Sequence, residues 1–492
     1  MSKKYLSYTA VSLGERCRKA FFLSLNHPEF KDAISEERKV LLNQSRELKV
    51  KARDLFPGGI KVEKDINNLE KAANDTLFFI QSGETILYDA VFIFEGIFVV
   101  IDILLFESGN WKFFEVKNSL RINNGYFKEM SFVHLAIKNT VHASPDAFLI
   151  TINSDFVLNK DSTVIDLFHI QNVSKQIREN LYLIETKIKN AKILENITTL
   201  PEEKIGNKCI SPYDCDFIKY CWKEIPDESV LKINGLPFPK RVEFFDSGKK
   251  TIHEIDDFEG IPTPIKNQIV SVRNKEERVE WQKLMTYVSK ICFPAMLFDM
   301  EFLSSAIPKI SGTRPFEQIP FAFTSFLIDS NFEKIDEVNF VSDPSRNLEQ
   351  DLVGSLLPML SRCKSIVVYD KGMELAWIKK IKKENLHLDF IKETNKPIID
   401  LYEPIRKGYY YHYLMQGKYS LKQVYKAITK KSFNDNKLIS SGLIASQVYH
   451  SLFSDDDPVR RDTIIQQLKE YSRADVDALF ELLLKFYRFQ MH

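Results

Sequence analysis

The sequence lacks an apolar run long enough to cross a membrane. The longest such run, residues 97–106, is interrupted by Asp102, whereas a spanning helix needs about 20 apolar residues. The N-terminal segment MSKKYLSYTA is polar and does not have the pattern of a secretory signal. We therefore expect a cytoplasmic protein that does not bind membranes.

An excess of charge of either sign is also lacking. The chain has 68 Lys and Arg residues against 67 Asp and Glu residues, so net charge gives no sign of a nucleic-acid partner. A local basic groove around an acidic site would cancel in this total. No Gly-rich phosphate loop of the helicase type is found, so any unwinding of nucleic acid would need a helicase partner.

Cysteines are few, but four of the six lie in the first 235 residues. In a reducing compartment such clustering favours metal or cluster ligation over disulfides. Four thiolates suit an iron–sulfur cluster, and zinc would accept the same four sulfurs. Four unrelated buried thiols are the alternative. The four residues are Cys17, Cys209, Cys215 and Cys221, whereas Cys292 and Cys363 are expected in the core.

The length of 492 residues is sufficient for two or three domains. Helical and strand patterns alternate, which indicates the α/β class. We expect one domain over residues 1–235, a partly helical connector over 236–290 and a second domain over 291–492. The expected helices cover 4–51, 124–140, 174–195, 274–290 and 468–489, and the expected strands cover 76–81, 86–94, 99–105, 111–116, 148–152, 164–170, 295–302 and 365–368.

Charged residues occupy unusual positions in the expected hairpin of residues 99–116. Asp102 lies within an apolar strand, and Glu115 and Lys117 project from one face of the next strand. Mg²⁺ is held by one or two carboxylates in proteins, and a nearby lysine can orient or help deprotonate a water molecule. The pattern therefore predicts a nuclease-type metal site. An ion pair on an edge strand, with Asp102 capping a turn, is the alternative.

A second acidic set lies in the last 200 residues. Asp299 and Glu301 share one face of an apolar strand, Glu374 opens a helix, and Tyr471 and Asp475 are four residues apart on another helix. Two carboxylates at this spacing can hold a pair of divalent ions about 4 Å apart. The set predicts a two-metal phosphodiesterase site.

Aromatic and basic residues alternate over residues 407–413, KGYYYHY. They would suit a rim that stacks bases and contacts phosphates beside the second site. A partly buried aromatic strand would have the same pattern.

Asp102 and Glu115-Val116-Lys117, together with the four cysteines, resemble the iron–sulfur branch of the PD-(D/E)XK nuclease superfamily, which includes the CRISPR-associated adaptation nucleases. The resemblance implies a restriction-endonuclease-like mixed sheet with helices. It also implies a 4Fe–4S cluster on Cys17, Cys209, Cys215 and Cys221. Asp102 and Glu115 would bind Mg²⁺ or Mn²⁺, and Lys117 would be the third catalytic residue.

The second set resembles the DEDD exonucleases of the ribonuclease H-like (DnaQ-type) fold, in the variety with a tyrosine in the last motif. That resemblance implies Mg²⁺ or Mn²⁺ on Asp299, Glu301 and Asp475, with Glu374 and Tyr471 as further catalytic residues. The chain departs from the family at Glu374, where aspartate is usual. Asp370 could replace Glu374 as a ligand, and Asp400 would support the fold from outside the metal ligands.

Residues 314–323, 417–424 and 440–449 resemble a bacterial family of unknown function that fuses these two halves. Together the resemblances imply a metal-dependent DNA nuclease in repair or defence, with a 3′–5′ exonuclease in the C-terminal half. The substrate would be DNA with single-stranded ends, and a helicase or a defence complex would be a partner. An RNA-processing exonuclease and a nucleic-acid-binding adaptor with degenerate sites remain open alternatives.

Overall fold

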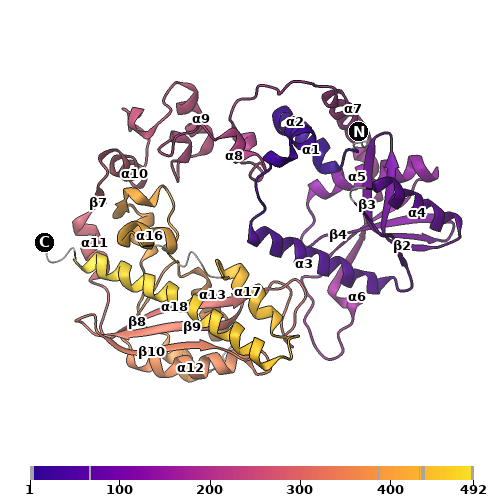
Figure 1. Cartoon of the computed structure of the whole chain (residues 1–492). Helices are drawn as coiled ribbons and strands as arrows, with labels where there is room; N and C mark the ends of the chain where they lie inside the picture. Colours follow the sequence, from indigo (N-terminus) through magenta and orange to yellow (C-terminus); the bar gives the residue numbers. More distant parts are fainter. Residues whose placement is uncertain (1–4, 66–67, 385–386, 432, 434–437, 489–492) are drawn as a thin grey trace. The chain divides into compact units, whose positions relative to one another are not determined.

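The computed structural model describes residues 5–65, 68–384, 387–431, 433 and 438–488, which form a mixed α/β structure (Figure 1). The chain divides into two compact units. The first unit comprises residues 1–223 and 305–316, and the second comprises residues 224–304 and 317–492. None of the described helices is long and apolar enough to cross a membrane.

In the described part of the first unit, six strands form one sheet in sequence order. The β2–β3, β3–β4 and β5–β6 pairs are antiparallel, and the β1–β2 and β4–β5 pairs are parallel. The expected hairpin is confirmed, because the two-residue turn at Ser108 and Gly109 has positive φ at both positions, as tight hairpins require. The strands are β1 (Ile60–Lys61), β2 (Ile86–Phe94), β3 (Ile97–Glu107), β4 (Asn110–Val116), β5 (Asp146–Ile152) and β6 (Phe168–Asn172).

Helices cover both faces of this sheet. Phe113 of β4 packs in a core with α5 and α7, whereas its neighbour Phe114 packs in a second core with Leu48 and Ala52 of α3. This alternation follows from the two-residue period of a strand. The helices are α1 (Tyr8–Arg16), α2 (Arg18–Asn26), η1 (Pro28–Phe30), α3 (Glu36–Ala52), η2 (Arg53–Leu55), α4 (Leu69–Gln81), α5 (Asn124–Val141), α6 (Val164–Leu167), α7 (Ser174–Glu195), η3 (Asn207–Cys209) and α8 (Ile218–Cys221).

Two sequence-based assignments in the first unit are wrong. Residues 76–81, expected as a strand, end helix α4, because Asn68 caps the helix and Thr76 is buried on its inner face. The strand expected over 164–170 divides into α6 and β6, since a capping box at Thr163 and Asp166 starts a helical turn. The helical pattern expected over 4–51 is confirmed for the described residues as α1, α2 and α3, with one break at Cys17, whose backbone is extended, and another between α2 and α3.

The described residues of the second unit contain a five-stranded sheet of order β10-β9-β8-β11-β12. Its first three strands are antiparallel, and β11 and β12 run parallel to β8. A separate two-stranded ladder joins β13 to β7. The strands are β7 (Glu277–Val279), β8 (Ala295–Leu303), β9 (Ile319–Ile328), β10 (Lys334–Val341), β11 (Ser365–Val368), β12 (Ile398–Asp400) and β13 (Tyr410–His412).

The two faces of this sheet are covered by different helices. Met296 and Phe298 of β8 pack in a core with α12 and α13, whereas Leu297 packs in a core with Val476 and Leu479 of α18. Helix α18 crosses the sheet over β8 and β9 (Figure 1). The helices are η4 (Val230–Lys232), α9 (Phe238–Asp246), η5 (Ile252–Glu254), α10 (Thr263–Asn274), α11 (Trp281–Val288), α12 (Leu348–Arg362), α13 (Gly372–Glu384), α14 (Leu388–Glu393), α15 (Tyr402–Arg406), η6 (Tyr413–Met415), α16 (Leu421–Thr429), α17 (Gly442–Ser451) and α18 (Pro458–Arg488).

Residues 236–290, expected as a connector, lie within the second unit. Ile265 and Ile269 of α10 and Leu284 of α11 share a core with α16 and α18. The single helix expected over 274–290 is wrong. Helix α10 ends at Asn274, Lys275 has a left-handed backbone, and β7 separates the two helices.

Candidate functional site

The acidic set of the second unit comes together from three elements. Because side chains alternate along β8, Asp299 and Glu301 lie on the face that α18 covers. Carboxylate oxygens of Asp299, Glu301 and Asp475 lie within 4.8 Å of one another. Glu374, from the first turn of α13, and Tyr471 of α18 line the same cavity of about 330 Å³. The set of five predicted from the sequence is therefore one site, called here the α18 site.

Burial dominates the electrostatics of the α18 site. It raises the pKa values of Asp299 and Glu301 well above their ordinary range, and the charge of Asp475 adds to this effect. Burial also raises the pKa of Glu374 to about 7 and that of Asp475 to about 6. Buried carboxylates this close need a compensating cation or a proton. Divalent cations fit these oxygen ligands.

Glu374 supports the same conclusion from its hydrogen bonding. Its carboxylate is buried, and its Oε2 atom has no hydrogen-bond partner in the part of the chain that the structure describes. A buried acceptor without a donor is unfavourable in an apolar setting. Glu374 lines the same cavity but lies outside the group of three residues whose ligand atoms come within 4.8 Å of one another, so it is a neighbour of that group.

Tyr471 is buried within the α18 site, 4% exposed. Burial and the nearby carboxylates raise its pKa, so the phenol keeps its proton. It donates a hydrogen bond to Asp475, which is four residues farther along the helix. Lys422 of α16 approaches the same hydroxyl, with its Nζ 3.3 Å away. Sequence reasoning did not identify this lysine as a site residue.

Asp370 and Asp400 lie beside the α18 site in different roles. Asp370 is exposed, lines the cavity and has a left-handed backbone with a φ of 60°. Its backbone N–H donates to Oδ1 of Asp400 at 2.8 Å, and the N–H of Tyr402 donates to the same oxygen at 3.0 Å. Asp400 therefore holds the turn that leads from β11 into α13.

The first unit brings Asp102, Glu115 and Lys117 together at the adjacent strands β3 and β4. Lys117 lies 3.5 Å from Glu115 and 2.8 Å from Glu129 of α5. The N–H of Val116 donates to Asp102 at 2.8 Å. Burial, then the charge of Asp102, raises the pKa of Glu115 to about 8, and none of the described residues donates a hydrogen bond to its Oε1. These carboxylates also fit a divalent cation.

Lys49 of α3 is an additional residue of this first-unit site. Its Nζ donates to Asp102 at 2.6 Å, and Asp102 is 5% exposed. Glu47, an acidic residue of the same helix, is exposed. Lys49 follows the buried Leu48 on α3, and no local pattern in the sequence distinguishes it from the other lysines of this helix.

The four cysteines lie together in the first unit. Cys17 stands between α1 and α2, and the other three follow from η3 to α8. Burial raises the pKa of Cys221 to about 11, and the other three thiols contribute to the rise. None of the four forms a disulfide. A positively charged metal or cluster core would lower the pKa values of these thiols and stabilise the thiolates.

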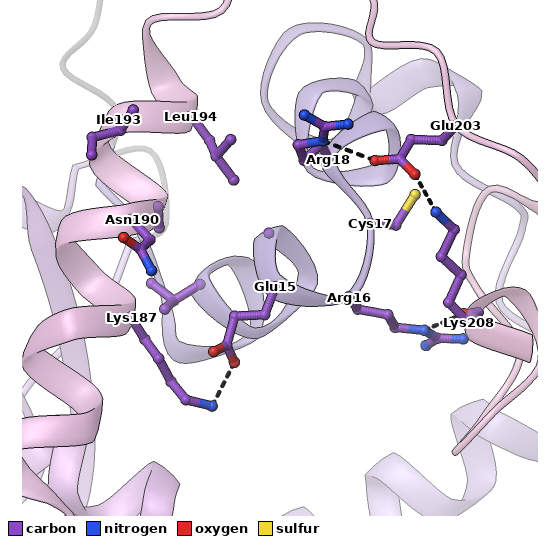
Figure 2. A pocket seen from close by; sticks show the side chains of 13 residues that line it. Glu15, Arg16, Cys17, Arg18, Lys187, Asn190, Ile193, Leu194, Glu203 and Lys208 are labelled. Carbon is purple, nitrogen blue, oxygen red and sulfur yellow. Dashed lines mark hydrogen bonds and ion pairs between the residues drawn. The ribbon is translucent and has the colours of Figure 1, made fainter.

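Ion pairs hold the cysteine-bearing segments in place around a cavity of about 480 Å³ (Figure 2). Glu203 contacts Lys208 and lies 3.0 Å from Arg18. Arg16 donates to the backbone carbonyls of Lys208 and Tyr213. Cys17 lies between these contacts, so the segment carrying Cys209 and Cys215 is fixed next to it.

Two expectations outside these sites are corrected. Tyr410 and Tyr411 are fully buried in β13, so the buried aromatic strand is confirmed and the base-stacking rim is wrong. Tyr410 packs against Phe486 of α18, and these apolar contacts bury the strand although the neighbouring Lys407 suggested an exposed segment. Cys363 is buried as expected, whereas Cys292 is exposed, because it lies in the loop before β8.

Comparison with known proteins gives one match. A family model described as "Domain of unknown function (DUF2779)" matches residues 296–420. This stretch includes Asp299, Glu301 and Glu374 and ends just before α16. No curated protein and no solved structure matches the chain.

Proposed function

We propose that this protein is a metal-dependent DNA nuclease, and that the α18 site hydrolyses phosphodiester bonds as a 3′–5′ exonuclease. The observation that carries the proposal is the convergence of four carboxylates and a tyrosine from β8, α13 and α18. Three of the carboxylates are buried, and that of Asp299 is half-buried. The strand order of the second unit, with an antiparallel triplet followed by two parallel strands, supports a ribonuclease H-like fold.

The residues of the α18 site have distinct roles in this proposal. Asp299, Glu301 and Asp475 would hold Mg²⁺ or Mn²⁺, with Glu374 as a further ligand. Bound divalent cations supply a nucleophilic water at neutral pH and stabilise charge on the phosphate. Tyr471 keeps its proton and hydrogen-bonds to Asp475, so it can orient that water. The covering helix α18 excludes bulk solvent from one side of the carboxylates.

The first unit would contain a second nuclease site of the PD-(D/E)XK type. Asp102 and Glu115 would hold Mg²⁺ or Mn²⁺, and Lys117 would orient the attacking water. The four cysteines would hold a 4Fe–4S cluster, with zinc as the alternative. Zinc keeps its sulfur ligands about 2.3 Å from the metal. Among the described residues, only the Asp299 group brings three ligand atoms within 4.8 Å of one another. The cysteine sulfurs are therefore spaced more widely than a single zinc ion would hold them, which favours the larger 4Fe–4S cluster.

The test is nuclease activity of anaerobically purified protein on end-labelled single-stranded DNA, double-stranded DNA and RNA with Mn²⁺. Wild type is compared with Glu115→Ala, Glu301→Ala and the double variant, and with Glu63→Ala as an exposed-carboxylate control. We expect loss of stepwise 3′ trimming in Glu301→Ala and loss of all cleavage in the double variant.

Other outcomes would overturn the proposal in different ways. Cleavage of RNA and not DNA would identify an RNA-processing exonuclease. DNA binding without cleavage by wild type would identify an adaptor with degenerate sites. Release of nucleotides from the 5′ end would refute the assigned polarity.

A further inference from the structure

Lys422 occupies the edge of the α18 site. It lies in the first turn of α16, and Ser420 and Leu421, which begin that turn, line the same cavity. Its Nζ donates to the backbone carbonyl of Ser440 at 2.8 Å and lies 4.7 Å from the centre of the Tyr471 ring. Among the described residues, it is the only cationic side chain that lines this cavity.

The charge balance of the α18 site indicates a role for the positive charge of Lys422. Asp299, Glu301, Glu374 and Asp475 carry four negative charges when ionised, and two divalent cations would neutralise them. A phosphodiester then adds one negative charge that the carboxylate–metal set does not balance. Lys422 supplies one positive charge, which would offset the charge of the phosphodiester.

The contacts of Lys422 leave it able to reach a ligand. An ammonium group has three donors, and among the described residues those of Lys422 reach a neutral carbonyl and a neutral hydroxyl. No carboxylate of the described residues lies within ion-pair distance of Lys422, unlike Lys49 and Lys117 of the first unit. The N-terminus of α16 beside it also favours an anion.

We infer that Lys422 is the phosphate-binding residue of the α18 site, contacting a non-bridging oxygen of the 3′-terminal nucleotide. This inference rests on the proposed function. It assigns substrate binding to α16, which begins just beyond the stretch matched by the family of unknown function.

The test measures binding rather than cleavage. Calorimetry with Ca²⁺ present gives the affinity for thymidine 5′-monophosphate, and titration of metal-free protein gives the affinity for Mn²⁺. The variants are Lys422→Met and Lys422→Arg, with Lys426→Met as a control, because Lys426 is exposed one turn farther along α16. Thermal melting verifies that each variant is folded.

We expect Lys422→Met to weaken nucleotide binding by about tenfold or more, as loss of a hydrogen bond to a charged group does. Its affinity for Mn²⁺ stays equal or rises, because a positive charge has left the site. Lys422→Arg retains nucleotide binding within a few fold, and Lys426→Met behaves as wild type.

Equal nucleotide affinity in Lys422→Met and wild type would overturn the inference and leave the proposed function standing. Parallel losses of Mn²⁺ and nucleotide affinity would also overturn it, since they indicate a structural role. Wild type that binds neither Mn²⁺ nor the nucleotide would refute the proposed function together with the inference.

Discussion

The raised pKa of Glu374 predicts that the stability of the metal-free second unit falls as pH rises. Its pKa is about 7 in the folded protein against an ordinary value of 4.5. Between these two values the folded state holds a proton that the unfolded state has lost, so the free energy of unfolding decreases with increasing pH. At 1.36 kcal/mol per pH unit, the decrease from this one group is about 3 kcal/mol.

The substitution Glu374→Gln isolates this contribution, because an amide of nearly the same shape does not titrate. At pH 4.5 the variant and wild type should differ little, since both side chains are neutral. By pH 7.5 the metal-free variant should have gained about 3 kcal/mol relative to wild type. Glu259→Gln, at an exposed position, should show no such gain.

The measurement is a urea titration at each pH, followed by pulsed hydrogen exchange and mass spectrometry of peptides from β8 and α18. These peptides report the second unit alone. A difference between variant and wild type that is constant with pH would refute the reasoning. Saturating Mn²⁺ should stabilise wild type more at pH 7.5 than at pH 5.5, because binding needs ionised carboxylates.

Three further predictions concern the other residues. Lys49→Met should raise the Mn²⁺ affinity of the first-unit site, measured by calorimetry in an Asp299→Asn background, because it frees Asp102. Cys215→Ser should lower the iron and acid-labile sulfide content of anaerobically purified protein and reduce its visible absorbance; unchanged content would exclude ligation by Cys215. Tyr471→Phe should slow DNA hydrolysis by about tenfold or more, with Mn²⁺ affinity within a few fold of wild type, and a rate equal to wild type would exclude a role in orienting water.

Local sequence patterns were sufficient to predict the strands and helices that carry the site residues. The hairpin of β3 and β4 follows from two apolar runs around Ser108 and Gly109, and β8 follows from an apolar run of strand length. Strand alternation then dictates that Asp299 and Glu301 share a face. The helical spacing of Tyr471 and Asp475 dictates that they face the sheet together. These periodicities depend on residues close together in the chain, so they can be predicted from the sequence without knowledge of tertiary contacts.

Tertiary contacts decided the elements that sequence analysis assigned wrongly. Residues 76–81 are rich in β-favouring side chains, yet Thr76 is buried on a helix face, donates to Ala72 and accepts from the N–H of Val91. Lys49 and Lys422 were missed for a related reason. Each is a lysine on an amphipathic helix, and only the packing of that helix directs it to a carboxylate or a tyrosine far away in sequence.

The balance of charge distinguishes the two candidate sites. The α18 site combines four carboxylates with one lysine that has no carboxylate partner among the described residues, so its negative charge is balanced by protons or by cations from solution. In the first-unit site Lys49 and Lys117 contact three carboxylates, so the protein itself supplies most of the compensation. A divalent cation there would have to displace Lys49 from Asp102 before it could use that oxygen. Metal binding in the first unit would therefore be coupled to movement of Lys49, whereas in the α18 site it would relieve repulsion between the carboxylates.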